Sequence, residues 1–165
     1  MSAAPESAQS RKERRDAALA ALVAGVPYAR FLGIAFERRG DELTALLPFQ
    51  PSLIGNPLIP ALHGGATAAF LEVTAIIELA WSALIEDEAA IDPARLPRMP
   101  KTIDFSIDYL RPGLPRDAYA RARVNRSGRR FASVHVEAWQ DSRARPFATA
   151  TGHFLMPGGA GAGDG

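Results

Sequence analysis

Residues 61–85 read ALHGGATAAFLEVTAIIELAWSALI, and this stretch decides the fold of the chain. Its nearly continuous apolar content predicts one long helix that reaches about Ile85, with Gly64 and Gly65 in the first turn. Helix starts usually avoid glycine in favour of better helix formers. Two glycines in a row therefore indicate that another group approaches the backbone closely at this point.

The segments on either side of this helix read as one more helix and a sheet. Residues Arg11–Val23 predict an N-terminal amphipathic helix, and we interpret the charge run at residues 11–15 as a solvated face rather than a nucleic-acid patch. Proline-rich segments at 50–60 and 86–100 predict loops. Alternation of apolar and polar residues predicts strands, of which the last four should form an antiparallel meander. The predicted strands are Ile34–Arg38, Leu43–Pro48, Thr102–Leu110, Ala118–Asn125, Phe131–Gln140 and Pro146–Met156.

This element order predicts an α+β fold, in which an antiparallel sheet wraps a long central helix, and not an alternating βαβ fold. Small residues recur on one face of the later strands and suit close packing against the helix. A helix that is apolar on nearly all sides must be enclosed, so we expect a second copy of the chain to complete its burial. We predict a single domain at residues 11–157, a disordered segment at 1–10 and a flexible Gly/Ala tail at 158–165.

Composition narrows the classes of function. The 165 residues carry a net charge of +1 and no cysteine. The balanced charge gives no support for a nucleic-acid partner, and the lack of thiols excludes disulfides, zinc–thiolate sites and cysteine nucleophiles. No secretory signal pattern is evident, and charged residues interrupt the apolar helix. We therefore expect a cytoplasmic protein without membrane insertion.

Two carboxylates on the long helix have open roles. Glu72 has only apolar neighbours three and four positions away, so burying it without a partner would be costly. It either faces solvent or bonds a loop backbone, or it stands in a desolvated cleft as a general base or nucleophile. Glu78 lies about 120° away around the helix, and we expect it at the surface.

The start of the helix offers a second candidate group. The Gly64 and Gly65 amides belong to the free N–H groups of the first turn, where the helix dipole favours an oxyanion such as a polarised thioester carbonyl. His63 could be a helix cap, a loop-orienting residue or a general base. The other histidines, His135 and His153, are on predicted strands, so we expect no metal site.

Distance along the helix separates these two candidates. Gly64 and Glu72 are eight residues apart, which is about 12 Å of helix axis. Reacting atoms need to come within about 3.5 Å, so one chain cannot easily bring both groups to one substrate. Two such helices packed antiparallel about a two-fold axis would place each Glu72 near the Gly64 of the other subunit.

Several short motifs together resemble the hotdog-fold acyl-CoA thioesterases, and in particular the phenylacetate-pathway (PaaI-like) branch. They are HGG at 63–65 with an acid nine residues after the histidine, YLRP at 109–112 after an alternating strand, and GRR at 128–130. The resemblance runs from about Gly33 to Met156.

This resemblance implies hydrolysis of an acyl-CoA thioester by water, without a metal or a cofactor beyond the coenzyme A of the substrate. By position, Gly64 would supply the oxyanion-hole amide and Glu72 the base or nucleophile. Family members often carry Asn or Gln seven residues before the first glycine. That position here is Pro57, and Asn56, one residue earlier, is the candidate to contact the thioester or water.

The resemblance also implies a homodimer, commonly assembled as a dimer of dimers. Candidates to bind the substrate's coenzyme A part are Gly65, Arg111, Arg126, Arg129 and Arg130. Two alternatives stay open: an acyl-CoA hydratase or dehydratase, and a non-catalytic acyl-CoA or lipid-binding protein that keeps the fold.

Overall fold

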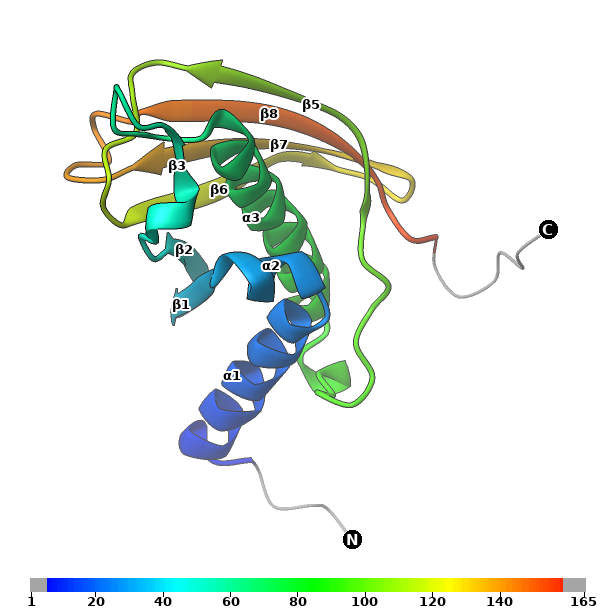
Figure 1. Ribbon diagram of the computed structural model, residues 1–165. Coiled ribbons are helices and arrows are strands. Elements are labelled where there is room, and N and C mark those ends of the chain that lie inside the picture. The colour runs from blue at the N-terminus through cyan, green and yellow to red at the C-terminus, as the bar shows by residue number, and fades with distance from the viewer. Residues whose placement is uncertain (1–5, 159–165) are drawn as a thin grey trace, which may run out of the picture.

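The computed structural model describes residues 6–158 and shows a curved sheet with a long helix on its concave face (Figure 1). The helices are α1 (Ala8–Ala24), α2 (Pro27–Leu32) and α3 (Gly64–Ile85). The strands are β1 (Ala35–Arg39), β2 (Glu42–Leu47), β3 (Ile54–Asn56), β4 (Ala61–Leu62), β5 (Lys101–Tyr109), β6 (Ala118–Ser127), β7 (Phe131–Trp139) and β8 (Ala148–Leu155). The predicted α+β class and the long helix are confirmed.

The six long strands form one antiparallel sheet in the order β1-β2-β6-β7-β8-β5. Strands β6, β7 and β8 follow one another as a meander. The prediction that β5 begins this meander is wrong, because β5 pairs with β8 and lies at the edge of the sheet. The connection from β5 to β6 therefore passes the other two strands, and β5 has one unpaired side.

Small side chains allow α3 to lie close to the sheet, as predicted. Ala45, Ala120, Ala138 and Ala148 are register partners on four adjacent strands, and all four are fully buried. A methyl group is the whole of each side chain, so the helix can approach the backbone there, while Phe70, Leu71, Ile77 and Trp81 of α3 fill the rest of the core. By length and composition α3 could also cross a membrane, but in this fold it is the core helix.

A bulge in β5 changes which way its side chains point. The register of β5 shifts between Thr102 and Asp104, so Thr102 pairs with the buried Phe154, whereas Asp104 pairs with His153. Paired residues of antiparallel strands share a face, so the extra residue turns Thr102 inward toward α3. The alternating pattern of residues 102–109 would predict Thr102 and Asp104 on the same face of the strand, and the bulge makes this prediction wrong.

Several predicted boundaries differ from the structure. Helix α1 begins at Ala8, capped by the Ser7 side chain, so the segment predicted as disordered is helical from Ala8. The predictions for residues 1–5 and 159–165 concern residues that the structure does not describe. The predicted loop at 50–60 contains a 3-10 turn at Pro51–Leu53 and strand β3, which pairs with β4 just before α3.

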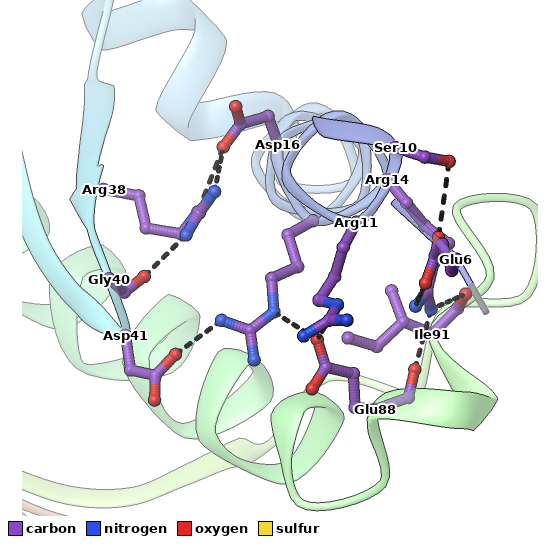
Figure 2. Close-up of polar contacts among 11 residues, drawn as sticks. Glu6, Ser10, Arg11, Arg14, Asp16, Arg38, Gly40, Asp41, Glu88 and Ile91 are labelled. Atoms are coloured by element: carbon purple, nitrogen blue, oxygen red, sulfur yellow. Dashed lines mark hydrogen bonds and ion pairs between the residues drawn. The ribbon is translucent and has the colours of Figure 1, made fainter. Parts of the chain in front are cut away.

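Part of the charge run of α1 is solvated, as predicted, since Arg11, Lys12 and Glu13 are exposed. Arg14 and Arg15 differ from the prediction, because they are partly buried in tertiary contacts (Figure 2). Arg14 donates to the carbonyl oxygens of Glu88 and Ile91, in the segment that follows α3. Arg15 bridges the carboxylates of Asp41 and Glu88, at 2.7 and 3.1 Å. These contacts hold α1 against the turn between β1 and β2 and against the segment that leaves α3.

Glu78 is half-buried, which corrects the expectation that it lies at the surface. Burial raises the pKa of its carboxyl to about 7, the Ser82 hydroxyl donates a hydrogen bond that opposes this shift, and the nearby Glu42 carboxylate adds to it. The ionised carboxylate is the costly form at this position, because it is removed from water and has no cationic partner among the residues that the structure describes.

The raised pKa of Glu78 predicts a pH-dependent stability. Between about pH 4.5 and 7 the native state keeps a proton that the unfolded chain has lost, so the free energy of unfolding falls as pH rises. Glu78→Gln should remove this loss and stabilise the protein at pH 8 by roughly 3 kcal/mol at most, with no gain at pH 4. Urea unfolding across this pH range measures it. Glu37→Gln, at an exposed site, is the control, and parallel curves for wild type and Glu78→Gln would contradict the assignment.

Candidate active site

His63 is the N-cap of α3. Its backbone is extended (φ −61°, ψ 132°), and its Nδ1 accepts a hydrogen bond of 2.9 Å from the Gly65 N–H. An imidazole nitrogen that accepts this bond carries no proton, so the proton of neutral His63 is on Nε2. Of the three roles left open for His63, the geometry corresponds to the helix cap.

Glycines on both sides make room for this imidazole. A Cβ on Gly65 would lie 3.0 Å from the ring of His63, and a Cβ on Gly55 would lie 2.9 Å from the His63 Cα. The close approach that the glycine pair indicated is therefore made, in part, by the protein's own capping histidine.

Within the described part of the chain, the Gly64 amide is a free donor at the start of α3, as is the amide of Ala66 two residues later. Among the residues that the structure describes, the Gly64 N–H has no hydrogen-bond acceptor, whereas the Gly65 N–H is occupied by His63. The Gly64 carbonyl accepts a hydrogen bond of 2.8 Å from the hydroxyl of Tyr109, at the end of β5. A free N–H at the positive end of a helix dipole can bind an oxyanion, and of the glycine pair this donor is Gly64 and not Gly65.

Glu72 has a partner that the sequence did not indicate. The Thr102 hydroxyl, turned inward by the bulge of β5, donates a 2.6 Å hydrogen bond to Glu72 Oε1. The bond fixes one carboxylate oxygen and leaves the other free to accept a proton or to attack. Glu72 is half-buried, which places it between the two environments that we considered.

The two halves of the candidate site lie apart within one chain. Gly64 is held by Tyr109 at one end of β5, and Glu72 is bonded to Thr102 near the other end. The helix between them is continuous, so the separation of about 12 Å along its axis applies. A single chain therefore presents an oxyanion donor and a carboxylate that cannot meet on one carbonyl.

A cavity of about 530 Å³ opens beside the start of α3. It is lined by Tyr28, Phe31 and Leu32 of α2, by Gln50, Ser52 and Leu53, and by His63, Gly65 and Ala66. The rings of Tyr28 and Phe31 stack at 5.6 Å and are more than half exposed, so they form an apolar wall at its mouth. The cavity could accept an apolar chain that ends near the Gly64 amide.

Asn56 has one of its two side-chain polar groups occupied. It is exposed at the end of β3, and its Oδ1 accepts a hydrogen bond of 3.0 Å from the Leu58 N–H in the turn to β4. Its side-chain NH₂ keeps its donors. The role proposed for Asn56 stays a prediction.

The four candidate arginines lie at two ends of the molecule. Arg111 follows Tyr109 at the end where α3 begins, and lines a small cavity with Arg116 and Arg145. Arg129, in the turn between β6 and β7, lines a cavity with Ser82 and Glu86 at the other end of α3, and Arg126 and Arg130 flank that turn. One chain therefore cannot use all four on one coenzyme A phosphate.

The described part of the chain, residues 6–158, has no cluster of three or more His, Asp or Glu side chains placed to hold a metal ion. His135 and His153 lie on β7 and β8, and His153 pairs with Asp104 of β5 at 3.0 Å.

Comparison with known proteins gives consistent matches. The thioesterase superfamily matches residues 60–146, more than half of the chain. The medium/long-chain acyl-CoA thioesterase YigI of Escherichia coli (strain K12) is 33% identical over 135 residues, which are 79% of this chain and 86% of that protein.

Two solved structures illustrate the shared fold. A phenylacetic acid degradation-related protein from Ralstonia eutropha JMP134 superposes with a TM-score of 0.63 at 22% identity, covering 84% of this chain and 98% of that one. The BH2602 protein from Bacillus halodurans, crystallised with CoA, superposes with a TM-score of 0.60 at 24% identity, covering 94% and 97%. At these identities the likeness concerns the fold.

Proposed function

This chain belongs to the thioesterase superfamily, and we propose that it hydrolyses medium- or long-chain acyl-CoA thioesters at a site shared by two subunits. The hotdog fold and the resemblance to acyl-CoA thioesterases are confirmed by the family match and by the Escherichia coli relative. The phenylacetic acid degradation-related protein shares the fold. The proposed length of the substrate's acyl chain is taken from the name of the Escherichia coli relative.

One observation carries the proposed chemistry: among the described residues, the Gly64 N–H at the start of α3 has no hydrogen-bond acceptor. The Glu72–Thr102 pair lies farther along the same helix, at the other end of the edge strand β5. The Gly64 amide binds the thioester oxygen and stabilises the negative charge that develops on it. Glu72 of the other subunit either takes a proton from the attacking water or attacks the carbonyl itself. The products are the free acid and coenzyme A.

Pairing of two subunits along the edge strand β5 would bring Gly64 of one subunit close to Glu72 of the other. The outer side of β5 is unpaired, and the strand exposes the large apolar residues Ile103, Tyr109 and, just beyond it, Leu110. An antiparallel pairing of two copies of β5, centred on residues 105–106, sets Thr102 of one copy opposite Tyr109 of the other. Glu72, bonded to Thr102, then lies beside the Gly64 that the second subunit's Tyr109 contacts.

The same pairing brings the separated arginines toward one substrate. The end of β5 that leads to Arg111 in one subunit meets the Lys101 end of β5 in the other, which is the end where Arg129 lies. We assign the phosphates of coenzyme A to this region, with arginines from both subunits. The acyl chain enters the cavity behind His63, lined by Tyr28 and Phe31.

A panel of acyl-CoA substrates tests the proposal. Purified protein is mixed with acetyl-, phenylacetyl-, octanoyl-, dodecanoyl- and palmitoyl-CoA, and release of free thiol is followed with a thiol-reactive dye. We expect the highest kcat/KM with the medium and long chains. Binding of acyl-CoA without thiol release from any substrate would favour the non-catalytic alternative and overturn the proposed function.

A further inference from the structure

The peptide group between Gly64 and Gly65 is held from both sides. Its carbonyl oxygen, on Gly64, accepts from the Tyr109 hydroxyl at 2.8 Å. Its N–H, on Gly65, donates to His63 Nδ1 at 2.9 Å. The two partners come from different parts of the chain, the edge strand β5 and the residue that caps α3.

Two glycines would otherwise make this turn loose, because neither has a side chain to restrict its backbone. The Gly64 N–H itself belongs to the preceding His63–Gly64 peptide, whose carbonyl oxygen accepts a hydrogen bond of 3.0 Å from the Thr67 N–H. With this peptide held on one side of the Gly64 Cα and the Gly64–Gly65 peptide held on the other, both φ and ψ of Gly64 are restricted, and so is the direction of its N–H. The two hydrogen bonds of the Gly64–Gly65 peptide also strengthen each other, because a carbonyl that accepts a bond makes its own N–H a better donor.

We propose that Tyr109 is a positioning residue for the oxyanion donor: with His63, it holds the Gly64–Gly65 peptide so that the free Gly64 N–H points at the thioester oxygen. This inference rests on the proposed function and adds a residue that acts through Gly64 without forming the donor itself. An oxyanion hole works through preorganisation, so an amide that must reorient during the reaction stabilises less charge.

Packing at Gly64 supports this role. A Cβ on Gly64 would lie 3.3 Å from the Tyr109 hydroxyl oxygen and 3.4 Å from the ring carbon that carries it. These contacts are tight, so the tyrosine lies on the glycine itself. Tyr109 reaches it from the inner face of the sheet, where its register partner is the buried Ala148.

Tyr109→Phe tests the inference, since it removes one hydroxyl and keeps the ring on Gly64. We expect kcat to fall about tenfold with KM unchanged within about twofold, as for the loss of one hydrogen bond that acts in the transition state. Tyr119→Phe is the matched control, because the Tyr119 hydroxyl makes no hydrogen bond among the residues that the structure describes, and its ring stacks on Trp139. It should leave kcat unchanged.

A double variant separates positioning from general destabilisation. In a Gly64→Pro background the donor N–H is absent, so adding Tyr109→Phe should have no further effect on kcat. Equal tenfold losses in both backgrounds would show that Tyr109 acts elsewhere and would overturn the inference.

A measurement without substrate keeps the inference separate from the proposed function. In ¹⁵N-labelled protein, Tyr109→Phe should accelerate hydrogen exchange of the Gly65 amide and move its resonance, whereas Tyr119→Phe should do neither. If the exchange rate and the resonance of the Gly65 amide were unchanged, the proposed role of Tyr109 in holding the Gly64–Gly65 peptide would be refuted even in an active enzyme. Suppose that wild-type protein hydrolyses no acyl-CoA, but the Gly65 amide exchanges faster and shifts in Tyr109→Phe. The proposed function then fails, whereas the hold of Tyr109 on the Gly64–Gly65 peptide is supported as a structural feature.

Discussion

Glu72→Gln should lower kcat for acyl-CoA hydrolysis by about 10²- to 10⁴-fold, the range typical for loss of a general base. The substitution keeps the size of the side chain and an oxygen that can accept from the Thr102 hydroxyl, so the contact between α3 and β5 is preserved. It removes the basic oxygen that takes the proton or attacks. We expect binding of a non-hydrolysable acyl-CoA analogue, measured by calorimetry, to change by less than about threefold.

Two further variants make this result specific. Thr102→Ser keeps the hydroxyl that orients Glu72 and should retain most activity, whereas Thr102→Val should lower kcat without abolishing it. Residual activity near the wild-type level in Glu72→Gln would exclude this carboxylate as base or nucleophile. Incorporation of oxygen-18 into Glu72 during a single turnover in labelled water then separates the covalent route from direct attack by water.

Local sequence patterns were sufficient for the main elements of the fold. The apolar run predicted α3, and alternation with small residues predicted both the strands and the face that packs on the helix, because these features depend on neighbours within a few positions. Strand order does not depend on such local neighbours, so local patterns could not predict it. β5 precedes β6 in the chain but pairs with β8, and only the assembled sheet shows that β5 is an edge strand.

In the candidate site, too, local sequence predicts some residues, whereas others depend on tertiary structure. Glu72 and Gly64 stood out because a carboxylate in an apolar run and a glycine pair at a helix start are locally unusual. Thr102 did not, because strict alternation assigns it to the outer face, and the bulge that turns it inward leaves no clear local signal. Tyr109 was noted as part of a motif, and its contact with Gly64 depends on the tertiary approach of β5 to α3.

Gly64→Pro should lower kcat by about 10²- to 10³-fold, as expected when one oxyanion-hole donor is removed. Proline is tolerated at the first position of a helix, and His63 already has the extended backbone that a residue before proline requires. The substitution therefore removes one N–H with little other change. Gly64→Ala is the matched control: it adds the same Cβ against Tyr109 but keeps the N–H, and it should retain much more activity.

Mixing the two inactive variants tests whether the site is shared between subunits. In a dimer of one Glu72→Gln chain and one Gly64→Pro chain, one site has both substitutions and the other has neither. Random co-assembly makes half of the dimers mixed, each with one intact site, so about a quarter of the wild-type activity should return. A site contained within one chain would recover nothing, because every chain would lack either the donor or the carboxylate. Recovery on co-expression, against none when the purified variants are mixed without subunit exchange, would thus place Gly64 and Glu72 on opposite sides of one active site.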